Sequence, residues 1–262
     1  MPVELTVLGS GDAFNSAGRG NACYLLRDAL GALCVDFGPT ALMQLKARRV
    51  APNDIDAIFI THLHGDHFGG VHLFLIDAEY SSRRERPLTI CGPIGVRSRL
   101  ERWHELAFGK ASPNRRFQLN FIELDAGQTR EILGRRVTAF PMAHMQPTDS
   151  PLGYRFELDD ACVALSGDTA WTDALIELAQ GTDLFVCDCT EASGTSPQHL
   201  SWEALAPKVD LLRTRHLLLS HLGASMRQAA TTIEGGHVSL AEDGLCLTLS
   251  AGPRTTDTGH AI

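Results

Sequence analysis

Hydrophobic and polar positions along this chain follow two periods, and each period predicts its own kind of element. Apolar residues at helical spacing predict helices, and short apolar or alternating runs predict strands. The helical spacing covers 40–50, 67–80, 94–108, 172–179 and 201–212. The strand pattern covers 5–8, 21–26, 32–36, 57–60, 88–93, 117–124, 136–140, 152–158, 161–165, 183–188 and 216–221. This order of elements indicates a fold of layered α and β structure.

The end of the chain carries two further signals. Residues 238–249 have Asp243-Gly244 near their centre, which predicts a closing β-hairpin. Gly, Thr, Pro and Asp dominate from Ser250 onward, so we expect residues 251–262 to form a flexible tail. A chain of 262 residues fits one large domain, and we predict a single domain over residues 1–250.

The largest concentration of potential metal-ligating side chains lies directly after the apolar run 57–60. There, His62, His64, Asp66 and His67 fall within six residues, and Gly65, Gly69 and Gly70 supply flexible backbone. A turn at the end of a strand can gather such side chains, whereas a strand alternates them between two faces. Imidazoles and a carboxylate are ligands that Zn(II) prefers. The alternative is a histidine-rich loop without metal, but four ligand-type residues in this spacing favour a metal site.

Other polar residues are ambiguous when each is considered alone. An isolated histidine such as His144 is more often structural, and Asp168 would also suit the cap of the helix at 172–179. His72 is expected at the surface or in packing, His104 is expected in the core or at the surface, and neither His216 nor His260 is expected to have a functional role. Cys187 and Cys189 are expected to be buried thiols, because a single pair at this spacing is a poor metal site.

Several motifs resemble those of one known family. The segment from Phe59 to His67 is similar to the signature of the metallo-β-lactamase fold hydrolases. Within that family, the glycine turn Gly9-Ser10-Gly11, the segment Ser166-Gly167-Asp168-Thr169, Asp188-Cys189-Thr190 and His199-Leu200-Ser201 resemble the ribonuclease Z-like branch. The resemblance implies a four-layer αββα sandwich of two mixed β-sheets flanked by helices. It also implies that residues 1–250 form a hydrolase domain.

The resemblance further implies a role for each matching residue. His62, His64 and His144 would hold one metal ion; Asp66, His67 and His221 would hold a second, and Asp168 would bridge the two. Two divalent ions are implied, with Zn(II) expected and Mn(II) or Fe(II) as alternatives. A hydroxide between them would be the nucleophile. Asp66, His199 and Asp188 are the expected catalytic residues, with His199 as proton donor and Asp188 fixing its orientation.

Asp36, in Asp36-Phe37-Gly38, matches a family aspartate that lies behind the metal ligands. An equally good interpretation is a turn or helix-capping residue, so Asp36 is not counted as catalytic.

The charge distribution and the spacing between His144 and Asp168 limit which class of substrate is expected. The net charge is −8, yet residues 80–136 hold 12 Lys and Arg against 6 Asp and Glu. This segment is either an anion-steering surface or a solvated face. Members that process tRNA carry a long arm between the positions of His144 and Asp168, which here are only 24 apart. We therefore expect a phosphodiesterase acting on a small or cyclic nucleotide-like diester.

Several alternatives stay open. One is a ribonuclease Z-like RNA 3′-end endonuclease; others are a sulfate ester or lactone hydrolase, or a non-catalytic metal-binding protein. An anionic small molecule is the expected partner, RNA is disfavoured, and a homodimer is an open option. Seven cysteines without a C-x-x-C motif indicate a reducing cytoplasm, and no apolar run reaches the roughly 18 residues that a membrane span needs.

Overall fold

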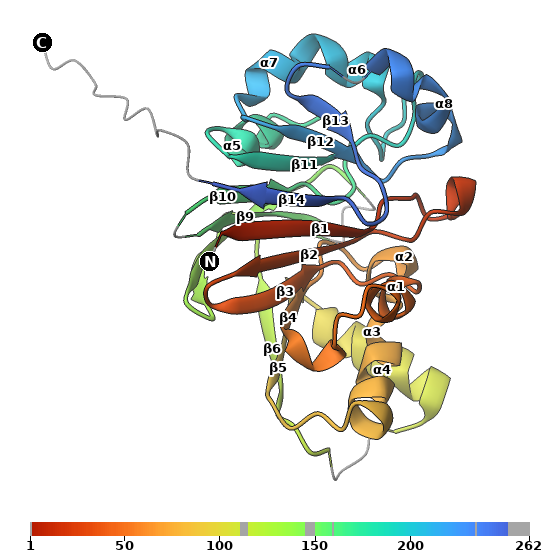
Figure 1. The fold of residues 1–262 in the computed structure, drawn as a ribbon, viewed down its shortest axis with the longest axis vertical. Helices are drawn as coiled ribbons and strands as arrows, with labels where there is room; N and C mark the ends of the chain where they lie inside the picture. Colours follow the sequence, from red (N-terminus) through yellow and green to blue (C-terminus); the bar gives the residue numbers. More distant parts are fainter. Residues whose placement is uncertain (1, 111–114, 145–149, 159, 234, 251–262) are drawn as a thin grey trace, which may run out of the picture.

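Two β-sheets stack face to face in the computed structural model, and helices cover the outer face of each sheet (Figure 1). The structure describes residues 2–110, 115–144, 150–158, 160–233 and 235–250. The predicted four-layer αββα sandwich is therefore confirmed. The predicted tail at 251–262 and part of the Asp159-Asp160 turn lie outside the described residues.

The first sheet has the strand order β14-β1-β2-β3-β4-β5-β6. Its strands are β1 Val3–Gly9, β2 Cys23–Asp28, β3 Gly31–Val35, β4 Ile55–Phe59, β5 Leu88–Pro93, β6 Leu119–Leu124 and β14 Cys246–Leu249. Its helices are α1 Ala41–Ala47, α2 Gly65–Phe68, α3 Val71–Ile76 and α4 Val96–Phe108, with short turns η1 Ser16–Gly18, η2 Pro52–Asp54 and η3 Asp77–Ser81.

The second sheet has the order β13-β12-β11-β10-β9-β8-β7. Its strands are β7 Thr129–Ile132, β8 Arg135–Pro141, β9 Leu152–Glu157, β10 Cys162–Leu165, β11 Leu184–Asp188, β12 Leu217–Ser220 and β13 Val238–Leu240. Its helices are α5 Ala174–Ala179, α6 Trp202–Leu205, α7 Val209–Leu212 and α8 Ala224–Ile233, with η4 Ala206–Lys208 between α6 and α7.

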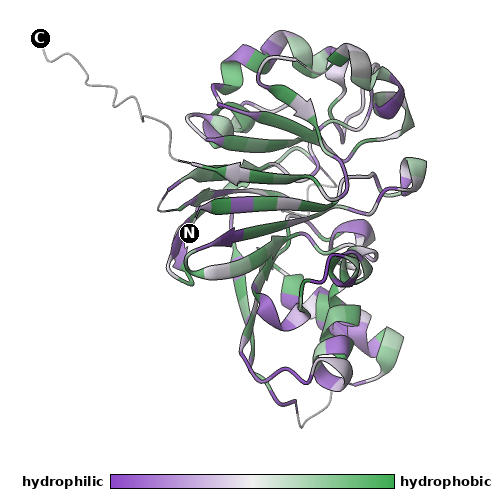
Figure 2. Cartoon of the chain, in the orientation of Figure 1, coloured by the Kyte–Doolittle hydropathy of each residue, from purple (hydrophilic) through white to green (hydrophobic). Residues whose placement is uncertain are grey.

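Three apolar clusters hold the layers together. The first lies between the sheets, the second between the first sheet and α1, α3 and α4, and the third between the second sheet and its helices. Figure 2 shows apolar residues along most strands, with polar residues more frequent on the helices. Both faces of β4, β10, β11 and β12 are covered, which explains their nearly continuous apolar sequences.

Strand direction places the candidate site. In the first sheet β3, β4, β5 and β6 run parallel, and in the second sheet β10, β11, β12 and β13 run parallel. The polar segments of the sequence follow the carboxyl ends of β4, β10, β11 and β12. These segments therefore meet at one rim of the sandwich, as is common in sheets with parallel strands.

The predicted closing hairpin is wrong. Residues 238–240 pair with β12 in the second sheet, whereas residues 246–249 pair with β1 in the first. The Asp243-Gly244 turn crosses between the sheets, because the Asp243 carboxylate accepts hydrogen bonds from Ser10 N, Ser10 Oγ and Gly20 N. The sequence analysis also missed β7, whose first three residues are exposed, and α8.

Other expectations hold. The structure describes all seven cysteines as thiols rather than disulfides, and six of them, including Cys187 and Cys189, are buried. Ser201 is the N-cap residue of α6, since its side chain accepts a hydrogen bond from Ala204 N. In the part of the chain that the structure describes, every helix is too short or too polar to cross a bilayer.

Candidate metal centre

The loop after β4 delivers the first group of ligands. Ile60 ends the buried run, His62 lies in the turn, and His64 is the extended N-cap residue of α2. His67 lies on α2 itself, one turn further on. This change from strand to turn to helix is what lets neighbouring polar side chains point toward the same space.

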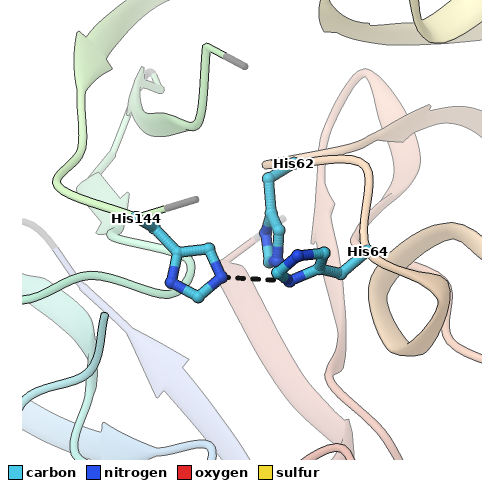
Figure 3. A group of neighbouring side chains, drawn as sticks. All are labelled: His62, His64 and His144. Atoms are coloured by element: carbon cyan, nitrogen blue, oxygen red, sulfur yellow. Dashed lines mark hydrogen bonds between the residues drawn. The ribbon is translucent and has the colours of Figure 1, made fainter. Parts of the chain in front are cut away.

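Three imidazoles converge at the first cluster (Figure 3). The potential ligand atoms of His62, His64 and His144 lie within 4.8 Å of one another. His144 follows β8 in the second sheet, and its Nε2 lies 3.0 Å from Nδ1 of His64. The cluster is therefore built from both sheets.

The second cluster lies beside the first. The ligand atoms of Asp66, His67, Asp168 and His221 also lie within 4.8 Å of one another. His221 follows β12 and has φ +58°, a left-handed conformation that is uncommon for a residue with a side chain. That conformation turns its imidazole toward Asp66, with Nε2 3.4 Å from Oδ2.

Asp168 lies between the two clusters. Its Oδ1 is 3.2 Å from Nε2 of His67. Its Oδ2 is 3.7 Å from Nε2 of His62 and 3.8 Å from Nε2 of His144. Helix α5 begins at Ala174, with Asp173 as its N-cap residue, so Asp168 does not cap that helix.

Hydrogen bonds to the outer ring nitrogens set which nitrogen of each imidazole faces inward. Nδ1 of His67 donates to Asp36 (2.8 Å), and Nδ1 of His144 donates to the carbonyl oxygen of Gln198 (2.8 Å). Nδ1 of His62 donates to the Thr61 hydroxyl (3.1 Å). Each neutral ring then presents the lone pair of Nε2 to the centre, as metal-bound histidines do.

Two of these inward nitrogens lack protein donors. Nε2 of His62 and Nε2 of His67 are buried and without a hydrogen-bond partner. Nε2 of His67 instead faces two carboxylate oxygens at 3.2 Å, one from Asp66 and one from Asp168. Lone pairs facing lone pairs in a buried site are unfavourable unless a cation lies among them. The donor set therefore fits divalent metal ions.

The pKa values in the two clusters shift in opposite directions. Burial and the neighbouring imidazoles lower the pKa of His62, and burial lowers the pKa of His144. Burial also lowers the pKa of His221, but the carboxylates, Asp168 first, outweigh it and raise the pKa to about 9. The pKa of Asp66 is lowered, since His67 and His221 outweigh the effect of its burial. The second cluster thus carries the negative potential that attracts cations.

Asp36 orients candidate ligand histidines and does not act as a helix cap. Its carboxylate accepts from Thr61 N (2.8 Å), from the Thr61 hydroxyl (2.9 Å) and from Nδ1 of His67. The side chain is almost fully buried, and the residue has φ +57°. Asp36 therefore fixes His67 directly and His62 through Thr61.

A carboxylate–imidazole pair adjoins the clusters. Oδ2 of Asp188, at the end of β11, lies 3.0 Å from Nδ1 of His199, and Asp188 is buried. Burial lowers the pKa of His199, but Asp188 outweighs it and the net pKa is raised. The His199 ring stacks on that of His221, with centroids 5.3 Å apart, and about a quarter of its side chain is exposed. Its second nitrogen, Nε2, is thereby directed away from Asp188.

All residues that the sequence analysis proposed for the site thus meet at one rim. The analysis missed Thr61, Thr190 and the Gln198 carbonyl oxygen, which hold histidines by hydrogen bonds. Both threonines belong to motifs that the sequence analysis recognised, so the sequence could have indicated them. The Gln198 carbonyl oxygen belongs to the backbone, and the sequence does not indicate its role. His72 accepts a hydrogen bond from Trp103, His104 is buried and the ring of His216 lies beside the Ser239 hydroxyl, in agreement with the surface, core or non-functional roles expected of them.

The fold and this donor set define a metal-dependent hydrolase of the β-lactamase superfamily. The sequence profile of the β-lactamase superfamily domain matches residues 32–222, which is most of the chain, and the chain belongs to that family.

Within the superfamily the chain is ribonuclease Z-like. It is 29% identical to Ribonuclease Z of Mycobacterium bovis over 194 residues, covering 70% of this chain and 69% of that protein. It is 27% identical to Ribonuclease BN of Escherichia coli over 278 residues, covering 85% of this chain and 90% of that protein. Among solved structures, human tRNase Z, short form, is similar with a TM-score of 0.76 and 25% identity, covering 94% of this chain and 99% of that chain.

Proposed function

We propose that this protein is a dinuclear phosphodiesterase acting on a small or cyclic nucleotide-like phosphodiester. The observation that carries the proposal is the shared position of Asp168 between two ligand clusters, next to the Asp188–His199 pair. His62, His64 and His144 would hold one divalent ion, and Asp66, His67 and His221 the other, with Asp168 between them. Zn(II) is the expected ion, and Mn(II) or Fe(II) also suits a carboxylate-containing site.

When bound, the two ions supply an activated water near neutral pH and neutralise charge on the phosphoryl oxygens. The chain supplies the rest. Asp36, Thr61 and Gln198 hold imidazoles in one orientation and tautomer. Asp188 holds Nδ1 of His199, so that Nε2 can carry a proton to the leaving-group oxygen. Proton donation of this kind contributes about 10²–10⁴-fold to the rate.

The preference for a small diester is supported by what lies between His144 and Asp168. Only 24 positions separate the two residues, and the strands β9 and β10 both lie within that length. Several arginines of the segment 80–136 are also engaged within the protein. Arg84 is buried, and Arg86, Arg97 and Arg115 form ion pairs with Asp56, Glu101 and Glu79. Fewer cations are therefore free to bind a long polyanion.

A second candidate is an RNA 3′-end endonuclease, favoured by the relatives named Ribonuclease Z and Ribonuclease BN. It predicts binding to structured RNA that weakens steeply with salt. Arg83, Arg99 and Arg102 are exposed and are the residues to replace in testing it; Arg84 is not, because it is buried. A reducing cytoplasm suits seven cysteines that are thiols rather than disulfides, and it is the proposed location of either enzyme.

The test compares bis(p-nitrophenyl) phosphate with p-nitrophenyl phosphate and p-nitrophenyl sulfate, using protein loaded with Zn(II) or Mn(II). We expect a strong preference for the diester and a loss of about 10²–10⁴-fold in kcat for His199→Ala. His216→Ala is the matched control, since His216 directly precedes β12, the strand that His221 follows. Protein with both metal sites filled that hydrolyses no diester would refute the proposal. RNA cleavage without activity on small diesters would favour the second candidate.

A further inference from the structure

The Thr190 hydroxyl lies among three polar groups of the site. Its Oγ1 is 2.8 Å from Oδ1 of Asp188, 3.0 Å from Nδ1 of His221 and 3.3 Å from Nδ1 of His199. A hydroxyl has one hydrogen to donate and can accept two. The carboxylate can only accept, so the Thr190 hydroxyl donates to Asp188 and accepts from the imidazole N–H groups.

This arrangement favours one tautomer of the neutral His221 ring. If Nδ1–H of His221 donates to Thr190, its Nε2 carries the lone pair that faces Asp66 and Asp168, at 3.4 Å and 3.5 Å. In the same group, Nδ1 of His199 lies closer to Asp188 than to Thr190, at 3.0 Å against 3.3 Å. One hydroxyl therefore touches both a candidate metal ligand and the candidate proton donor.

The backbone of Thr190 is fixed by the segments that carry these two histidines. Its N–H donates to the carbonyl oxygen of Leu200, which follows His199, at 3.0 Å. Its carbonyl oxygen accepts from the N–H of Gly223, two residues after His221, at 2.9 Å. A Cβ at Gly223 would lie 2.8 Å from that carbonyl oxygen, so the close approach requires glycine. The hydroxyl is thus held in place from both sides.

The same arrangement occurs on the other side of the centre. There the Thr61 hydroxyl donates to Asp36 (2.9 Å) and lies 3.1 Å from Nδ1 of His62, while Asp36 also holds His67 directly. Each side therefore has one carboxylate and one threonine that together orient two imidazoles. The two sides differ in that Asp36–Thr61 orients two candidate ligands, whereas Asp188–Thr190 orients one ligand and one proton donor.

We propose that Thr190 is a positioning residue that couples the metal-ligand imidazole of His221 to the Asp188–His199 pair. Its hydroxyl stabilises the His221 tautomer that binds metal and, through Asp188, the orientation of His199. The inference rests on the proposed function for the role of His199, but not for the role of His221. Loss of the hydroxyl should therefore weaken metal binding and, separately, slow turnover by protein that is saturated with metal.

The experiment compares Thr190→Val, which keeps the shape and removes the hydroxyl, with Thr190→Ser, which keeps the hydroxyl. Thr182→Val is the control, because it removes a fully buried hydroxyl at the opposite end of β11. Zn(II) affinity is measured by competition with a chromophoric chelator, and kcat and KM are measured on metal-saturated protein. Removing the outer partner of a ligand histidine typically costs about 10–100-fold in metal affinity or activity, and we expect that loss for Thr190→Val alone.

A measurement on the unaltered protein guards against a variant that fails to fold. Long-range ¹H–¹⁵N correlation of the imidazoles in the zinc-loaded protein is expected to place the His221 proton on Nδ1. A proton on Nε2 of His221 would overturn the proposal. Equal losses in Thr190→Ser and Thr190→Val, or wild-type metal affinity in Thr190→Val, would do the same. Absence of diesterase activity in the unaltered protein would refute the proposed function, while the zinc and imidazole measurements would still decide the role of Thr190 toward His221.

Discussion

Arg84 offers a sharp test of how the arginine-rich segment is used. Its guanidinium is almost fully buried and donates to five backbone carbonyl oxygens. The shortest bonds reach Pro87, Ile55 and Arg86, at 2.6, 2.8 and 2.8 Å. The side chain therefore fixes the segments that lead into β4 and β5.

The cost of Arg84→Met follows from these contacts. Two of the five hydrogen bonds, those to Ile55 and Pro52, lie in buried surroundings, and the other three acceptors can be reached by water. A buried polar group left without its partner costs about 1–3 kcal/mol, so two predict a loss of about 2–6 kcal/mol. That is a large part of the roughly 5–15 kcal/mol by which native proteins are stable.

Urea unfolding of zinc-loaded protein, followed by circular dichroism, measures this loss as a shift of the midpoint. Arg83→Met is the matched control, because Arg83 is the exposed neighbour and its replacement changes the charge equally. A surface change of this kind is expected within about 0.5 kcal/mol of wild type. If both variants lose the same stability, or if Arg84→Met loses less than about 1 kcal/mol, the structural role of Arg84 is refuted.

Three further predictions concern the site and the sheets. Asp36→Asn places an amide N–H against Nδ1 of His67 and disfavours the tautomer that binds metal. Zinc affinity should therefore fall about 10–100-fold. An unchanged zinc affinity in a chelator competition would contradict this. Removal of the metal by a chelator should abolish hydrolysis and lower the unfolding temperature, because metal at 100 times its Kd adds about 2.7 kcal/mol to the stability of the folded protein. Calorimetry that shows an unchanged unfolding temperature after verified metal loss would disprove this. Arg135→Met removes the partner of buried Asp28 and should cost about 3–5 kcal/mol in urea unfolding, whereas exposed Arg136→Met should cost little.

Sequence alone predicted the parts of the fold whose patterns are local. The buried strands and most helices follow from apolar spacing, and the ligand loop after β4 follows from four ligand-type residues in six positions. The sandwich itself, and the ligands from distant segments, came from the family resemblance. His144 and Asp168 are ambiguous one at a time, and only their motifs made them candidates.

The failures share a physical cause. Residues 238–249 have a hairpin's local signals, but pairing with β12 and β1 and the contacts of Asp243 with Ser10 outweigh them. Strand β7 has no apolar alternation and forms because it pairs with β8 through the turn at Leu133-Gly134, where both residues have positive φ. The roles of Asp36 and Thr190 likewise depend on which imidazole lies beside them, which spacing along the chain does not show.

The connection between Asp243 and Ser10 has a consequence for biosynthesis. These residues are 233 positions apart, and β14 pairs with β1 in the first sheet. The pairing on that side of β1 can therefore form only after β14 has been synthesised. Contacts across such sequence separations form slowly, because the intervening chain must be ordered first. The Ser10 loop in turn contacts Leu222, the neighbour of His221. A chain emerging from the ribosome therefore cannot complete this rim until residue 249 has been made, so the ligand segments from His62 to His221 are all synthesised before the rim can close.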